Sequence, residues 1–246
     1  IFFFICFAYN ILRAAKDSLS VTAPSSGAEV IPFMKVWVIL PMAFLMTIFF
    51  TRLVNKFDTK KIFYIMISSF LGFFALFSIF LFPLREFLHP HQFADQLEAI
   101  VPIGLKGFVA LIRNWTYTAF YAMAELWGTT ILTVLFWGFA NEILHVKTAK
   151  RFYVLILIGG NLSTICAGIA ATTMSSIAGR WAALSATDPW QYSILFLCSI
   201  VIASGIVVML IFRWLHRNVL QNPQHKHHIA YDTEKSTERM SLRKNF

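Results

Sequence analysis

Six apolar stretches, each long enough to cross a lipid bilayer, constrain the fold of this chain more than any other feature. A helix needs about 20 apolar residues to cross roughly 30 Å of hydrocarbon. Hydrophobic residues make up 58% of the sequence and charged residues 13%, whereas soluble domains average about 25% charged residues. We therefore predict an all-α integral membrane protein. The expected spans are residues 1–21, 31–53, 62–83, 114–140, 152–177 and 191–214.

Positive charges gather at the ends of these stretches and predict the orientation of the chain. The formal net charge is +9. Cations follow the second and fourth stretches and recur through residues 215–246, three regions that alternate to the same side of the membrane. Short basic loops and tails of this kind face the cytoplasm. We therefore expect both ends of the chain to be cytoplasmic and residues 215–246 to form a basic linker or tail. The same distribution argues against a nucleic-acid partner.

Arg13, Lys16 and Asp17 lie inside the first apolar stretch. Each such charge costs roughly 2.5–3.5 kcal/mol near the centre of a membrane helix. Asn10, Arg13 and Asp17 share one helical face, since they are spaced i, i+3 and i+7. One interpretation is a cavity-facing site in which Arg13 and Lys16 bind an anionic substrate. The other is that Arg13 pairs with Asp17 near the membrane interface.

A second intramembrane charge, Glu125, lies in the fourth stretch between apolar neighbours. A carboxylate there is either paired or protonated, and we expect Lys16 or Arg13 as its partner. Asn141 lies near the cytoplasmic end of the same stretch. Asn161, in the fifth stretch, follows two glycines and either lines a cavity or packs between helices.

Motifs for enzymatic chemistry are absent from the sequence. It contains no Gly-x4-Gly-Lys-[Ser/Thr] loop, no His-Glu-x-x-His and no Gly-x-Ser-x-Gly. Cys6, Cys166 and Cys198 lie in apolar stretches without metal-ligand spacing. We therefore expect no catalytic residues, no metal and no cofactor. A solute carrier with this sequence would be driven by exchange or by an ion gradient. A non-transporting membrane subunit, in which the charges are structural pairs, is the remote alternative.

Five blocks of sequence resemble one family of membrane carriers. They are NILRAAKDSLSVTA at 10–23, GAEVIPF at 27–33, FYAMAELWG at 120–128, LFWGFANEI at 135–143 and AKRFY at 149–153. In this order they resemble the nucleotide transporters of the ATP/ADP translocase type, found in obligate intracellular bacteria and in plastids.

The resemblance implies a twelve-helix carrier with a major-facilitator-like fold that exchanges ATP for ADP. This chain would then be its N-terminal six-helix half, residues 1–214, followed by the linker 215–246. Because the sequence starts at Ile1 rather than at Met, we also expect it to begin inside a longer polypeptide. The partners implied are ATP and ADP, the lipid bilayer and a C-terminal six-helix half. The membrane implied is the inner membrane of an intracellular bacterium, or a plastid envelope.

The family's first-helix lysine corresponds to Lys16, and its fourth-helix glutamate to Glu125. A proton-coupled net importer of other ribonucleotides is the alternative carrier. The candidate nucleotide-binding residues are Lys16, Arg13, Glu125, Asp17, Asn10, Asn141 and Asn161.

Overall fold

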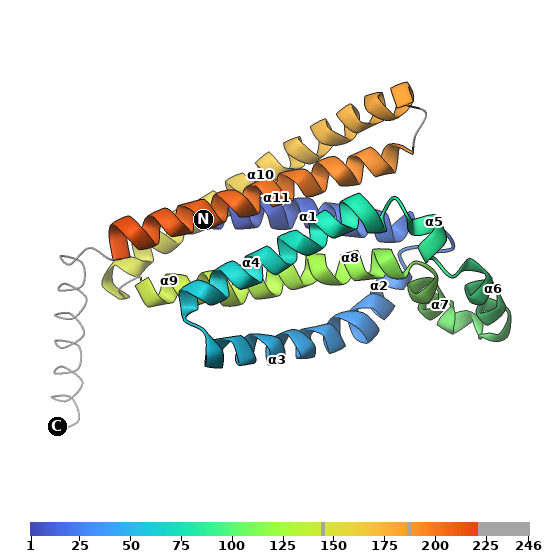
Figure 1. Cartoon of the computed structure of the whole chain (residues 1–246), viewed down its shortest axis with the longest axis horizontal. Coiled ribbons are helices and arrows are strands. Elements are labelled where there is room, and N and C mark those ends of the chain that lie inside the picture. The colour runs from blue at the N-terminus through green and yellow to red at the C-terminus, as the bar shows by residue number, and fades with distance from the viewer. Residues whose placement is uncertain (144–145, 186–187, 221–246) are drawn as a thin grey trace. The chain divides into compact units, whose positions relative to one another are not determined.

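The computed structural model describes residues 1–143, 146–185 and 188–220, and these residues form helices joined by short connections, without a strand (Figure 1). Phe2–Gly205 forms one compact unit, and α11 runs from it into a second unit that starts at Ile206. The aromatic core and the candidate site both lie within the first unit. Most of the tail predicted for 215–246, from residue 221 onward, lies outside the described residues.

Five helices of the described chain are long and apolar enough to cross a membrane. They correspond to the second to sixth predicted stretches. Their bounds are Val30–Lys56, Thr59–Leu81, Trp115–Ala140, Phe152–Ser185 and Pro189–Asn218.

Several of these helices contain π-helical segments. The first comprises α2 (Val30–Phe33), π-helical η1 (Met34–Ile39) and α3 (Leu40–Lys56), and the second α4 (Thr59–Leu76) and η2 (Phe77–Leu81). The third comprises α8 (Trp115–Leu126), η4 (Trp127–Phe136) and α9 (Trp137–Ile143). The fourth lies in α10 (Val146–Ser185), and the fifth joins α11 (Pro189–Leu215) to η5 (His216–Leu220).

The first predicted stretch forms α1 (Phe2–Val21), a helix of 20 residues. It is not among the five, and it carries three charged residues within its length. Its sequence up to Val21 contains no proline or glycine to interrupt the helix, and Pro24 soon afterwards prevents the helix from continuing. The prediction of six membrane-crossing helices is therefore supported for five. α1 packs along α10 on one side and along α8 and η4 on the other.

Aromatic side chains form the core between α1, α4 and α8. The rings of Phe77 and Phe120 lie 4.5 Å apart between centroids, and Phe74 packs against Phe120 at 5.8 Å. Trp127 packs edge-on against Phe70 at 5.7 Å. Its indole N–H donates a hydrogen bond of 3.4 Å to the carbonyl oxygen of Ile5. This core fixes the position of α8 against α1, and α1 and α8 carry the charged residues of interest.

Residues 84–113, between the third and fourth predicted stretches, form a helical insertion. It contains α5 (Arg85–Leu88), α6 (His91–Ile100), a 3-10 turn η3 (Ile103–Leu105) and α7 (Lys106–Arg113). Arg113 is buried and joins α7 to α6, donating to Asp95 at 2.6 Å and to Glu98 at 2.8 Å. This ion-pair cluster around a buried arginine explains how a polar segment folds compactly between two apolar helices.

The helix that contains the fifth predicted span is longer than that span. We expected it to end at 177, but α10 continues to Ser185. The added residues include Gly179 and Arg180, which lower the hydropathy, while the following Trp-Ala-Ala-Leu sequence still favours a helix. Hydropathy located the apolar part of the helix but not its end.

Candidate substrate site

Lys16 is the centre of a charged cluster between α1 and α8. Its side chain is only 5% exposed, and its ammonium nitrogen lies 2.8 Å from Asp17 Oδ1 and 3.1 Å from Glu125 Oε2. The ammonium also lies 4.0 Å from the centre of the Tyr121 ring. A buried ammonium requires such compensation, because burying an unpaired charge is costly. We call Lys16, Asp17, Tyr121 and Glu125 the Lys16 cluster.

The helical periods of α1 and α8 explain this geometry. Leu12 and Leu19 are buried on the same face of α1 as Lys16, so the lysine side chain is directed into the helix packing. Tyr121 and Glu125 are four residues apart on α8 and therefore lie on one face of it. The close approach of α1 to α8 brings the two faces together.

The two carboxylates are more accessible than the ammonium that they bind. Asp17 is 45% exposed and Glu125 28% exposed at the side chain, and Arg13, one turn before Asp17, is exposed. The four charges of Arg13, Lys16, Asp17 and Glu125 sum to zero. An anion that reaches this surface would therefore meet one accessible cation and a second cation shielded by carboxylates.

The ion pair predicted for Glu125 is present, and its partner is Lys16. The alternative pairing of Arg13 with Asp17 does not occur among the described residues, since Asp17 is bound to Lys16 instead. Tyr121 was missed by the sequence analysis. Its position four residues before Glu125, on the same helical face, is the signal that would have identified it.

Two of the asparagine candidates, Asn10 and Asn161, do not join the Lys16 cluster. Asn10 donates hydrogen bonds to the Cys6 carbonyl at 2.8 Å and to Thr164 Oγ1 at 3.1 Å, so it links α1 to α10. Asn161 is exposed on α10, three residues before Thr164. The side chain of Asn141 lies outside the part of the chain that the structure describes.

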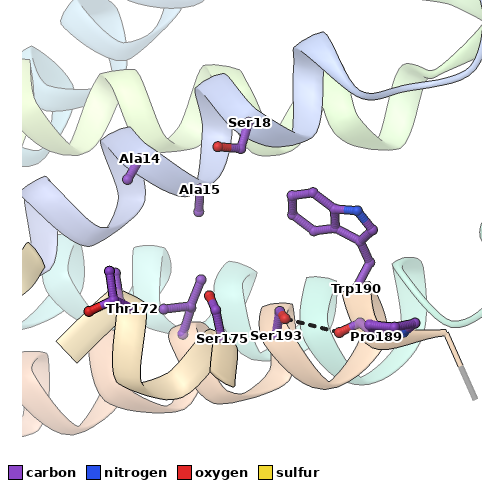
Figure 2. A pocket seen from close by; sticks show the side chains of 10 residues that line it. Ala14, Ala15, Ser18, Thr172, Ser175, Pro189, Trp190 and Ser193 are labelled. Carbon is purple, nitrogen blue, oxygen red and sulfur yellow. Dashed lines mark hydrogen bonds between the residues drawn. The ribbon is translucent and has the colours of Figure 1, made fainter. Parts of the chain in front are cut away.

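The structure also contains a groove that the sequence did not predict. It has a volume of about 530 Å³ and lies between α1, α10 and the beginning of α11 (Figure 2). We call it the Trp190 groove. Its lining includes Ala14, Ser18, Thr172, Ser175, Trp190 and Ser193.

Within the described residues, no three His, Cys, Asp or Glu side chains are placed to hold a metal ion. The three cysteines are free. The chemistry available at the Lys16 cluster is therefore that of cations, carboxylates and a phenol.

Comparison with known proteins identifies the family. The family model for the TLC ATP/ADP transporter matches residues 1–246. ADP,ATP carrier protein 1 of Chlamydia pneumoniae is 46% identical over 223 residues, which are 91% of this chain and 43% of the relative. The carrier of the same name from Chlamydia muridarum is 41% identical over 245 residues, all of this chain and 46% of the relative.

A plastid relative matches as well. ADP,ATP carrier protein 1, chloroplastic, of Arabidopsis thaliana is 40% identical over 218 residues, 89% of this chain and 35% of the relative. No solved structure gives a significant match. The chain thus spans less than half the length of these relatives. Because the family model covers residues 1–246, this chain belongs to the TLC ATP/ADP transporter family.

Proposed function

We propose that the protein to which this chain belongs is a secondary carrier that exchanges ATP for ADP. The proposal rests on the family and on the names of its relatives, which are ADP,ATP carriers of Chlamydia and of chloroplasts. One observation supports a site at particular residues. Lys16 is buried and bound by two accessible carboxylates, and Arg13 on the same helix is exposed. We assign the membrane to the inner membrane of an intracellular bacterium, because the carrier of Chlamydia pneumoniae is 46% identical to this chain and the chloroplast carrier of Arabidopsis thaliana 40%.

In this proposal the chain is the N-terminal six-helix half of a twelve-helix, major-facilitator-like carrier. Its domain comprises residues 1–214, with 215–246 as the cytoplasmic linker to the second half and both ends cytoplasmic. α1 would cross the membrane together with the five long apolar helices and so complete the set of six. Its charges would be tolerated because Lys16 is paired inside the helix packing. In support, α3 and α10 leave large apolar side chains exposed, among them Phe44 and Leu155. The lipid bilayer and the second half would cover such faces.

The Lys16 cluster suggests how a nucleotide is bound. Phosphate oxygens are strong acceptors for ammonium and guanidinium groups. An incoming phosphate chain would replace the carboxylates of Asp17 and Glu125 at the Lys16 ammonium and would contact Arg13. Without substrate, the carboxylates keep Lys16 neutralised and in place. Asn10, Asn141 and Asn161 would line the remainder of the path, as neutral donors and acceptors.

The same charge balance describes how substrate could leave. When substrate departs, the carboxylates of Asp17 and Glu125 return to the Lys16 ammonium, and these contacts replace those to phosphate. An outgoing and an incoming nucleotide would make the same contacts with the charged residues of the site. ATP and ADP differ by one negative charge, so each exchange moves one net charge. The membrane potential would therefore bias the direction of exchange.

The test uses the full-length protein in liposomes. We expect labelled ATP to enter vesicles loaded with ADP and not to enter empty vesicles. We expect Lys16→Ala to abolish this uptake, while Lys106→Ala, which removes an exposed ion pair with Glu98, leaves it intact. Equal uptake into loaded and empty vesicles would contradict exchange. Wild-type rates in Lys16→Ala would contradict the assigned site.

A further inference from the structure

The Trp190 groove has the size and the lining of a small-molecule site. Ligand sites in proteins usually enclose about 300–1,000 Å³, and this groove encloses about 530 Å³. Its walls are mostly apolar, with small residues such as Ala14 on α1 leaving room beside the helix backbone. A few hydroxyl groups interrupt the apolar lining. This combination suits a flat, mainly apolar ring with polar edges.

Trp190 gives the groove an aromatic surface. Figure 2 shows its indole projecting from the start of α11 into the space beside α1, near Ser18. The ring is half-buried, so one part of it is held by the protein and another part remains accessible. Aromatic side chains in such positions stack on nucleobases of any sequence, since every base has a π face.

Two hydroxyl groups of the groove are free to bind a ligand. Most serine and threonine hydroxyls in these helices bond to a carbonyl of their own helix. Ser193, for example, donates to the Pro189 carbonyl at 2.9 Å, and Thr172 to the Gly168 carbonyl at 3.0 Å. Ser18 and Ser175 differ, because their hydroxyls form no hydrogen bond with any residue that the structure describes. Ser18 lines the groove from α1 and Ser175 lines it from α10 (Figure 2).

The groove lies on the α10 side of α1, next to the accessible charges of that helix. Consecutive residues of an α-helix are rotated by about 100° and separated by 1.5 Å along the axis. Ala14 and Ser18 of the groove therefore directly flank Arg13 and Asp17, the accessible charges of α1. A ligand that extends from the groove around α1 would meet an aromatic surface and hydroxyls at one end and cations at the other. A nucleotide has this distribution of groups.

We infer that the Trp190 groove is the subsite for the base and ribose of the transported nucleotide. This inference rests on the proposed function and deepens it. The base stacks on the Trp190 indole, the hydroxyls of Ser18 and Ser175 bond to the polar edge of the base or to the ribose, and the phosphates extend toward Arg13 and Lys16. The groove thereby distinguishes a nucleotide from a bare phosphate chain.

The decisive experiment compares ATP with inorganic tripolyphosphate, which carries the phosphates without base or ribose. In liposomes with the full-length carrier, we expect Trp190→Ala to weaken the apparent affinity for ATP by about 5- to 150-fold, the range that corresponds to loss of one base–aromatic stack. Inhibition of uptake by tripolyphosphate should remain unchanged. Trp190→Phe should restore most of the affinity for ATP, because it keeps an aromatic face.

Two matched controls come from α10. Trp181→Ala removes an exposed tryptophan that does not line the groove, and Ser176→Ala removes a hydroxyl that bonds to the Thr172 carbonyl of its own helix. Both should leave the affinity for ATP unchanged. If Trp190 were only an anchor at the membrane interface, Trp190→Ala would weaken the apparent affinities for ATP and for tripolyphosphate equally or change neither. Either result would overturn the inference.

A second measurement covers the case in which Trp190→Ala does not fold. In a cysteine-free background, a small thiol reagent should modify Ser175→Cys, and both ATP and adenosine should slow the modification, whereas tripolyphosphate should not. Equal modification with and without adenosine would overturn the inference. Failure of the proposed function looks different, since wild-type protein would then show no exchange of ATP for ADP at all.

Discussion

The Lys16 ammonium lies 3.1 Å from Glu125 Oε2, and this contact joins α1 to α8 across more than a hundred residues of sequence. Asp17 provides a second carboxylate at 2.8 Å. The ammonium is buried, whereas both carboxylates are partly exposed. The contact therefore neutralises a buried cation and leaves its anionic partners where a competing anion can replace them.

Substitutions that reverse the charges of Lys16 and Glu125 should show whether ATP uptake needs the contact between them. We expect Glu125→Lys alone to abolish ATP uptake, because it places a second cation against a buried ammonium. The double variant Lys16→Glu with Glu125→Lys should restore the folded carrier, measured by thermal stability in detergent, but not uptake, because the cation then projects from α8. Full recovery of uptake in the double variant would show that the pair acts only in folding.

Removal of the Arg113 side chain should destabilise the helical insertion more than removal of any other single charged side chain there. Arg113 is buried and bonded to Asp95 and Glu98, so Arg113→Ala leaves Glu98 partly buried with only the exposed Lys106 as its partner. Breaking a buried ion pair from one side costs about 3–5 kcal/mol. We expect a loss near the lower figure, because Asp95 is 67% exposed.

The matched control for Arg113 is Lys106→Ala, which removes an exposed ion pair and should cost less than about 1 kcal/mol. Thermal melting of the solubilised full-length protein would measure both. Equal melting temperatures for the two variants would contradict the structural role of Arg113.

Much of the fold followed from hydropathy, since five of the predicted stretches became long apolar helices. The sequence limited the expected partner of Glu125 to Lys16 or Arg13 but did not distinguish between the two. The choice depends on the rotation of α1, which buries Lys16 beside Leu12 and Leu19 and leaves Arg13 exposed. That rotation is fixed by packing against two other helices and is not visible in α1 alone.

The Trp190 groove could not be predicted from the sequence for a related reason. Its lining comes from three helices, and no local pattern connects Ser18 with Ser175 or Trp190. The partner of Asn10 was not predictable for the same reason. The polar face of α1 predicted a place in the charged site, but the neighbouring α10 offers Thr164 as its partner. Contacts between distant segments, rather than helical period, decide these roles.

Gly128 should not tolerate a larger residue. It lies where α8 passes into η4, and a Cβ atom built there would come within 2.5 Å of the Tyr9 ring on α1. Because the neighbouring Trp127 is fully buried and bonded to the Ile5 carbonyl, α8 cannot easily move away. We expect Gly128→Ala to cost about 1–3 kcal/mol through overpacking, measured as a lower melting temperature.

Gly72→Ala is the matched control for Gly128, since a Cβ atom there would meet no atom within 4 Å. It should leave the protein as stable as the wild type, or slightly more stable because alanine favours helix. The double variant Gly128→Ala with Tyr9→Ala should recover part of the loss by removing the clash. Equal stability of Gly128→Ala and Gly72→Ala would contradict the close approach of α1 and η4.

His89 should make stability depend on pH. The side chain is buried between α5 and α6, and its Nε2 lies 2.7 Å from Thr116 Oγ1. Burial, with smaller contributions from His91 and Arg85, lowers the pKa of His89 to about 4, although Glu86 opposes the shift. In the unfolded chain the pKa is about 6.5. Between these two values the unfolded state binds more protons, so stability falls as the pH is lowered from about 6.5 to 4 and is fully present above that window.

The pH dependence can be assigned to His89 by substitution. Within the window, the free energy of unfolding changes with pH by at most about 1.4 kcal/mol per pH unit. We expect His89→Gln, which cannot take up a proton but can still bond to Thr116, to flatten the melting temperature of the full-length protein between pH 6.5 and 5. In this range most carboxylates stay ionised, so their titration adds little. His91→Gln, whose ring is half-exposed and lies 5.8 Å from that of His89, should keep most of the slope. Parallel curves for wild type and His89→Gln would show that the pKa of His89 is the same in the folded and the unfolded protein, which its burial against Thr116 argues against.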